Sequence, residues 1–169
     1  MKHLALFITL SLFPLLVHAQ DNFLKDRGQV IWQRVFENDT DIDRVELNLR
    51  SKGCFRDFYS QDGLVTAELY GLRLNIEGAG YKRMSVPIYL PNGIFSAFVK
   101  VQIKEGRYRV TVSRIWYHID RMGDTALESM ALNDDGKIED KFLGAPAKIL
   151  NYNFFSLFCN LGETDDDEW

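Results

Sequence analysis

Two long stretches near the middle of the chain alternate apolar and polar residues with a period of two. The first covers residues 94–104, and the second covers residues 107–117 after the turn sequence Glu105-Gly106. The apolar side of the first stretch is formed by Phe95, Ala97, Val99, Val101 and Ile103. Such alternation is typical of a strand in a sheet with one face buried and the other in water. The pattern predicts a long antiparallel hairpin whose apolar face other elements must cover.

The polar side of this hairpin is basic and carries one aromatic residue. It comprises Phe98, Lys100, Lys104, Arg107 and Arg109. Alternate residues on paired strands share one face, so we expect these side chains to be neighbours on the open face of the sheet. Two interpretations remain open. The cations either keep a sheet face soluble or bind an anionic partner, and exposure of Phe98 and Tyr89 among them would favour binding.

Two other segments predict helices that cover the apolar face. After a strand at residues 29–37, Asp39 and Thr40 are candidate N-caps, and apolar residues at helical spacing continue until Gly53. Near the C-terminus, the segment that Pro146 opens is apolar nearly all round, which is typical of a buried helix. The predicted fold class is α+β, with the order β-α-β(n)-α and two main helices packed on one face of an antiparallel sheet.

The region between the first helix and the hairpin predicts further strands. Residues 55–59 and 64–76 read as two of them, with a bulge or bend at Gly71 because the apolar side of the longer strand changes there. Residues 84–90 also alternate, and they predict a strand that a tight turn at residues 91–93 joins to the hairpin. Beyond the hairpin, Asp124-Thr125 predicts the cap of a short helix, with O-glycosylation of the threonine as an alternative.

Residues 1–19 read as a secretory signal peptide. A basic start at Lys2 precedes an apolar run shorter than the roughly 18 residues that cross a bilayer, and the small residue Ala19 precedes the expected cleavage point. We therefore expect an exported protein, periplasmic or secreted, with no membrane span. Its predicted organisation is a lead-in at 20–28, one domain at 29–161 and an acidic disordered tail at 162–169.

The charge of the chain argues against nucleic acid as a partner. The formal net charge is −4 at pH 7. The tail contributes Glu163, Asp165, Asp166, Asp167 and Glu168. Basic and acidic side chains balance in the remaining domain, whereas a domain that binds nucleic acid normally has a strong basic excess.

Few residues suit catalysis or metal binding. His118 is the single histidine after the expected cleavage point, because His3 and His18 precede it, so we expect no metal or cofactor. Cys54 and Cys159 are an even pair in an exported chain, where they form either a disulfide or two buried thiols. A cysteine paired with His118 remains the alternative for a hydrolase-like periplasmic enzyme.

Three segments carry a family likeness, namely VIWQRVF from Val30, GAGYKRMSVPIYL from Gly78 and FVKVQIKEGRYRVTV from Phe98. In order and spacing they resemble the exported bacterial proteins grouped as a domain of unknown function with a TBP-like fold, over about residues 29–158. The resemblance implies a curved antiparallel sheet with two helices on one face, as in TATA-binding protein. It implies no catalytic residues and does not import DNA binding. The acidic tail departs from the pattern.

The sequence therefore favours an exported, non-enzymatic module that binds or scaffolds through the open face of its sheet. The expected partner is an anionic ligand, a glycan or another protein. Two alternatives remain: the periplasmic enzyme, and a structural subunit of a cell-surface assembly that adds a strand to the free edge of its sheet.

Overall fold

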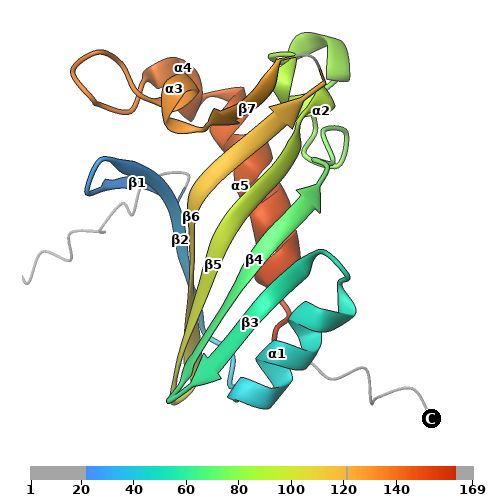
Figure 1. The fold of residues 1–169 in the computed structure, drawn as a ribbon, viewed down its shortest axis with the longest axis vertical. Coiled ribbons are helices and arrows are strands. Elements are labelled where there is room, and N and C mark those ends of the chain that lie inside the picture. Colours follow the sequence, from blue (N-terminus) through green and yellow to red (C-terminus); the bar gives the residue numbers. More distant parts are fainter. Residues whose placement is uncertain (1–21, 121, 163–169) are drawn as a thin grey trace, which may run out of the picture.

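A computed structural model describes residues 22–120 and 122–162 of the chain. Its strands are β1 Phe23–Asp26, β2 Gln29–Phe36, β3 Phe55–Gln61, β4 Leu64–Leu72, β5 Ile94–Lys104, β6 Arg107–Ile119 and β7 Gly123–Ala126. They form one seven-stranded antiparallel sheet in the order β1-β2-β6-β5-β4-β3, with β7 also paired to β6. Figure 1 shows the strands twisting and curving along their length, with α5 passing behind β4 and β5.

The helices are α1 Ile42–Ser51, α2 Tyr89–Asn92, α3 Glu128–Ala131, α4 Asp140–Leu143 and α5 Ala145–Phe158, and a 3-10 turn, η1, covers Arg83–Ser85. Helix α1 begins where the side chain of Asp41 accepts a hydrogen bond from the backbone N–H of Arg44 at 2.8 Å. The cap is therefore Asp41 and neither Asp39 nor Thr40. Instead, the Thr40 hydroxyl donates to the carbonyl of Leu161.

The two longer helices bury one face of the sheet, as the sequence predicts. Trp32 of β2 packs against Phe154 of α5 with ring centroids 5.6 Å apart, and both side chains are fully buried. Tyr108 of β6 donates a hydrogen bond from its hydroxyl to the carbonyl of Phe158 at 2.6 Å. Helix α1 joins the same core through buried apolar side chains such as Val45. This core fixes the hairpin β5–β6 and leaves its other face uncovered.

Two of the three bulges in the sheet interrupt the pairing of β5 with its neighbours, and each changes which residues face the helices. One lies in β4, where the pairing with β5 shifts between Leu69 and Leu72 and Gly71 takes a φ of 68°. This bulge is the one predicted from the sequence. The other interrupts the pairing of β5 with β6, and there Arg114 has a φ of 50°. A positive φ is unusual for a residue with a side chain, so the second bulge is a strained feature of the open face.

Several local predictions are wrong. Residues 84–90 form no strand but the turn η1 and the start of α2, and Met84 and Ile88 are 98% and 65% exposed. The expected turn at residues 91–93 is likewise the end of α2 and its C-cap. Asp124 and Thr125 cap no helix, since they lie within β7 and pair with β6. Finally, the segment 20–28, expected to be a lead-in, contributes strand β1.

The two cysteines are free in the structure, so the possible disulfide between Cys54 and Cys159 is not formed. Their chain neighbours explain why. Phe55 and Phe158 point into the core and pack with ring centroids 6.0 Å apart, whereas the adjacent cysteine side chains are only half-buried. One residue along a strand reverses the direction of the side chain, and one residue along a helix turns it by about 100°, so contact between Phe55 and Phe158 does not bring the thiols together.

The predicted signal peptide lies outside the described residues, and so does the predicted disordered tail apart from its first residue, Gly162. Within residues 22–120 and 122–162, no helix is long and apolar enough to cross a membrane. The longest described helix, α5, runs over Ala145–Phe158.

Candidate functional site

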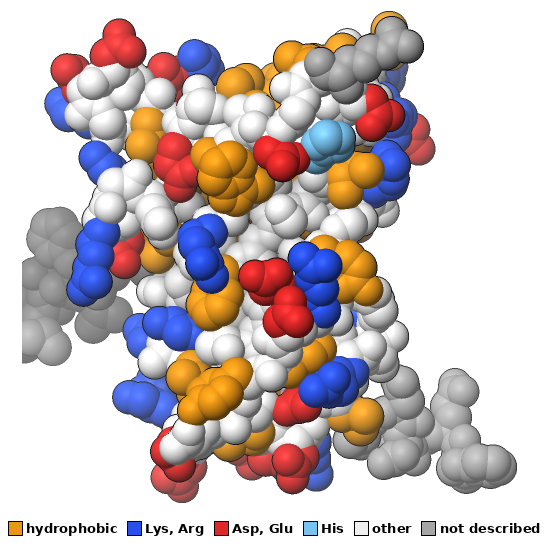
Figure 2. All heavy atoms as spheres, in the orientation of Figure 1, with side chains coloured by type: hydrophobic (Ala, Val, Ile, Leu, Met, Phe, Trp, Pro, Cys, Tyr) orange, Lys and Arg blue, Asp and Glu red, His pale blue; other side chains and the backbone are white. Residues whose placement is uncertain are grey.

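The uncovered face of the sheet holds the residues singled out in the sequence. On this face, pairing of the strands aligns Gln33, Thr111, Lys100, Thr66 and Tyr59 in one row and Val35, Arg109, Gln102, Leu64 and Gln61 in the next. In the orientation of Figure 1, basic, acidic and hydrophobic side chains are interspersed over the strands (Figure 2). This open face is thus a mixed polar and apolar surface on a rigid sheet.

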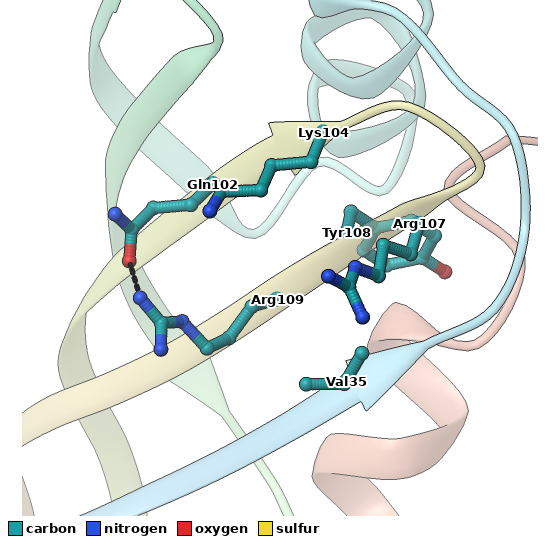
Figure 3. A pocket seen from close by; sticks show the side chains of 6 residues that line it. All are labelled: Val35, Gln102, Lys104, Arg107, Tyr108 and Arg109. Atoms are coloured by element: carbon teal, nitrogen blue, oxygen red, sulfur yellow. Dashed lines mark hydrogen bonds between the residues drawn. The ribbon is translucent and has the colours of Figure 1, made fainter.

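A hollow of about 230 Å³ lies at the hairpin end of the open face (Figure 3). We call it the hairpin hollow, and its lining residues are Val35, Gln102, Lys104, Arg107, Tyr108 and Arg109. Register explains the grouping, because Arg107 pairs with Lys104 and Arg109 pairs with Gln102 on the neighbouring strand. Cross-strand partners on one face lie close enough for their side chains to touch.

The hairpin hollow is lined by three cations and no carboxylate. Arg109 donates from Nη2 to Oε1 of Gln102 at 2.8 Å, which orients its guanidinium over the sheet. In the part of the chain that the structure describes, Lys104, Arg107 and Arg109 take part in no ion pair. Their charges and most of their hydrogen-bond donors therefore remain free to meet an anion.

Phe98 and Lys100 lie away from this hollow. Lys100 is half-buried and pairs with Thr111 on one side and Thr66 on the other. Thr111 is buried although it is polar, and Gln33 satisfies its hydroxyl by donating a hydrogen bond at 3.0 Å. Lys100 therefore lies where neighbouring side chains leave no hollow on the face of the sheet. The five predicted residues share one face, as expected, but they do not form one site.

Phe98 belongs to a second hollow, of about 210 Å³, farther along the open face. We call it the central hollow, and the side chains and backbone that line it belong to Arg56, Glu68, Leu69, Ser96, Ala97, Phe98, Arg114 and Trp116. The guanidinium of Arg114 lies over the ring of Phe98, 4.5 Å from its centroid. Trp116 is 44% exposed. Unlike the hairpin hollow, this one joins aromatic surface with both signs of charge.

Sequence reasoning missed Arg56, Glu68 and Trp116. Arg56 and Glu68 are cross-strand partners, with the guanidinium 3.5 Å from the carboxylate. Trp116 reaches the open face because the bulge at Arg114 changes which residues of β6 point inward. The sequence contained a signal for it, since apolar Val112 is followed by apolar Ile115 rather than by an apolar residue at 114.

His118 lies in neither hollow. Its Nδ1 is 2.8 Å from Oδ1 of Asp124, and all of these atoms belong to exposed side chains. Cys159 follows the end of α5 beside Tyr108, about 33 Å from His118 along β6. Cys54 adjoins β3, three strand spacings or about 14 Å from β6. The alternative of a cysteine–histidine pair is therefore not formed.

Burial also makes Cys54 a poor nucleophile. Desolvation raises the pKa of its thiol above the ordinary value, outweighing the attraction of nearby Lys52. Tyr89 is buried rather than exposed among the cations, and burial raises its pKa to about 12, with Tyr117 adding to the effect. Among the residues that the structure describes, no three histidine, cysteine or acidic side chains lie close enough to hold a metal ion.

Comparison with known proteins places the fold but not the function. No family model matches the sequence, and no curated protein is similar to it. A solved structure titled as a TBP-like protein from Parabacteroides distasonis superposes with a TM-score of 0.50 at 12% identity, covering 82% of this chain and 93% of that one. A DUF4468 family protein from Bacteroides ovatus gives a TM-score of 0.53 at 12% identity, covering 87% and 94%.

The fold is TBP-like. The predicted antiparallel sheet with helices on one face is thereby confirmed, and so is the resemblance on which the expectation partly depended. Sequence identity of this order transfers no ligand or reaction, because one fold hosts many functions. The function of this TBP-like chain must be argued from its own open face.

One edge of the TBP-like sheet is poorly suited to adding a strand. Strand β3 forms this edge, opposite the four-residue strand β1, and its pairing with β4 is interrupted between Arg56 and Tyr59. Asp57 within the irregularity has a φ of 55° and is exposed. Bulges and charged side chains on an edge strand hinder pairing with another chain. The site therefore favours binding across the open face over assembly through the edge.

Proposed function

We propose that this protein is an exported module that binds an anionic partner through the open face of its TBP-like sheet. The hairpin hollow is the observation that carries the proposal. Lys104, Arg107 and Arg109 converge there on one side of a rigid hairpin, and no carboxylate lines the hollow. Export is supported by the predicted signal peptide at residues 1–19.

The cations of the hairpin hollow are better placed for binding than for solubility alone. Basic side chains that only keep a protein soluble are usually interspersed with acids, which screen them. Here the strand register brings the side chains of Lys104 and Arg107 to cross-strand positions, at some electrostatic cost. An anion between them removes the repulsion and accepts hydrogen bonds from both.

Exposed charges bind weakly one at a time. An exposed ion pair contributes about 0.2 to 1 kcal/mol, so three cations alone give only modest affinity. A partner with repeated negative charges gains from several contacts at once, because the later contacts form within one complex. We therefore expect a polyanion, with binding that weakens as salt is added.

The test is charge reversal at Arg107→Glu with Arg109→Glu in the full chain, purified after export. Binding to immobilised dextran sulfate is measured by biolayer interferometry at several salt concentrations. We expect the double variant to lose at least tenfold in affinity at low salt, since two attractions become repulsions.

The matched control is Lys82→Glu with Lys148→Glu. It changes the net charge equally but alters exposed residues outside both hollows. Circular dichroism and the thermal midpoint show that each variant folds. The proposal is contradicted if both double variants lose affinity equally. It is also contradicted if the folded variant at Arg107 and Arg109 loses no affinity.

A further inference from the structure

We propose that the anionic partner is an acidic polysaccharide, which sets a sugar ring on Trp116 in the central hollow and extends its carboxylates towards the hairpin hollow. This inference rests on the proposed function and names the chemical class of the partner. It depends on Trp116, Arg114 and Glu68, none of which lines the hairpin hollow.

Trp116 provides a flat apolar platform in a polar setting. The side chain is 44% exposed, while its backbone pairs with Ser96 of β5 and with Ala126 of β7. A tryptophan held on both sides by paired strands keeps its ring in place at little cost in entropy. The apolar C–H face of a sugar ring packs well on such a surface, and its hydroxyl groups remain at the rim.

Arg114 stands beside this platform at a strained position. Its φ of 50° costs free energy that an ordinary strand residue would not, and strain of this kind gathers at functional sites. The bulge turns Arg114 to the open face, where its guanidinium stacks over Phe98. The contact with the ring occupies one side of the guanidinium and leaves N–H groups for a carboxylate. In the part of the chain described, Arg114 has no ion-pair partner.

The negative charge of Glu68 favours a polyanion with widely spaced charges over a densely charged one. Its carboxylate lines the central hollow and is 3.5 Å from Nη2 of Arg56. A carboxylate in the hollow repels a densely charged chain such as a polyphosphate. It accepts hydrogen bonds from hydroxyl groups, while Arg56 and the hydroxyl of Ser96 offer donors. A ligand rich in hydroxyl groups with spaced carboxylates fits this set, and a uronic-acid polysaccharide has that composition.

The two hollows suit one extended chain. Arg114 and Arg107 both lie on β6, about 23 Å apart along the strand. Lys100 stands between the hollows on the same face. A polysaccharide of several units spans this distance, and each cation meets a carboxylate along it. An acidic polypeptide also spans it but brings no ring to cover Trp116.

The experiment compares three soluble probes on the full chain: oligogalacturonate, a neutral maltooligosaccharide of equal length, and poly-glutamate. Calorimetric titration measures each affinity for the wild type, for Trp116→Ala and for Arg107→Glu with Arg109→Glu. We expect Trp116→Ala to weaken oligogalacturonate binding about tenfold, as lost aromatic contact predicts, and to leave poly-glutamate binding unchanged. Trp116→Phe should retain part of the affinity. Tyr152→Ala, which removes another partly exposed aromatic ring, from α5, is the matched control.

The outcomes separate this inference from the proposed function. Loss of oligogalacturonate binding in Trp116→Ala, with both acidic probes weakened by the arginine reversal, supports both. Trp116→Ala could leave every affinity unchanged while the arginine reversal weakens binding of both acidic probes. The assignment of a polysaccharide would then be wrong, and the proposed binding of an anion through the open face would remain. Equal weakening of poly-glutamate by Trp116→Ala makes the partner a polypeptide and overturns the inference. If no variant loses affinity for any probe, both proposals are overturned.

Discussion

The two faces of the hairpin β5–β6 differ in burial, in charge and in backbone strain. On the helix-covered face, Val99, Val101 and Val110 are fully buried. On the open face, Arg107 and Arg109 are exposed, and the bulge at Arg114 accepts a strained backbone. Packing on the first face sets stability, while the second holds charge and strain that do not contribute to it. Substitutions should therefore divide cleanly into those that change stability and those that change binding.

The largest effect should come from Trp32→Ala on the helix-covered face. Trp32 is fully buried between Phe154 and Phe158, and its indole N–H donates to Asn151 at 2.9 Å. Truncation should lower the free energy of unfolding by about 3 to 5 kcal/mol, from lost burial and the cavity left behind. Urea denaturation followed by circular dichroism measures it.

Trp116→Ala is the natural control for that experiment. The residue type and the change are the same, but Trp116 lies on the open face and is 44% exposed. Its cost should stay below about 1 kcal/mol. Similar costs at the two positions would remove the distinction between the faces.

Arg114→Gly should separate stability from binding at a single position. Glycine adopts a positive φ without strain, which offsets the lost stacking on Phe98, so the free energy of unfolding should change by less than about 1 kcal/mol. Affinity for oligogalacturonate should fall about tenfold, because the guanidinium is gone.

Arg114→Lys retains the charge and the strain and serves as the comparison. It should keep part of the affinity, although lysine cannot offer the planar edge of a guanidinium. A glycine variant that binds as tightly as the wild type would show that the strain at this bulge serves no ligand.

The sequence predicts the three cations that line the hairpin hollow, but of the side chains around the central hollow it predicts only Phe98, and the reason is physical. Period-two alternation is a local pattern, so it places Lys104, Arg107 and Arg109 on one face without any knowledge of the fold. A bulge breaks the period. At Gly71 the change of parity coincides with a glycine and is easily recognised, whereas at Arg114 an arginine adopts the positive φ. Nothing in its residue type marks that conformation.

Other errors follow from patterns too short to decide. Residues 84–90 alternate like a strand, but Pro87 lacks a donor, and the segment forms η1 and α2 instead. Strand β1, with the sequence FLKD, is too short to show a period, and only pairing with β2 defines it. The cysteines show a third limit. The fold does bring the segments around Cys54 and Cys159 together, as the packing of Phe55 on Phe158 shows, but an even count of cysteines does not fix which side chains meet.

A smaller effect should appear on the helix-covered side as a dependence on pH. The carboxylate of Glu46 in α1 accepts a hydrogen bond from the hydroxyl of Ser60 in β3 and another from Arg50 at 2.6 Å. These hydrogen bonds, that of Ser60 first, hold the pKa of Glu46 below its ordinary value. A lowered pKa in the folded state adds stability above the ordinary pKa of glutamate, and this stability is lost as pH falls through the folded value.

Glu46→Gln measures that contribution. At pH 7 it should lower the free energy of unfolding by about 0.5 kcal/mol, and the difference from the wild type should vanish at acidic pH. Glu128→Gln does not remove the Ser60 contact and gives a comparison at another partly exposed carboxylate, which accepts from the backbone N–H of Val30. A constant difference from neutral to acidic pH for Glu46→Gln would contradict the assignment. Neither variant should alter binding to the open face.

The smallest effect should follow deletion of residues 163–169. The described chain ends at Gly162, which lies against the backbone of Asp39, and the deleted segment carries Glu163, Asp165, Asp166, Asp167 and Glu168. Five negative charges attached to the domain repel an anionic probe or compete with it for the cations of the open face. Deletion should therefore tighten dextran sulfate binding by about two- to threefold at low salt, and the gain should disappear at high salt, where the charges are screened.

A variant that replaces the five acids with their amides keeps the length of the segment and should reproduce the gain. Weaker binding after deletion would mean that the segment helps to hold the ligand, and the open face alone would then no longer account for recognition.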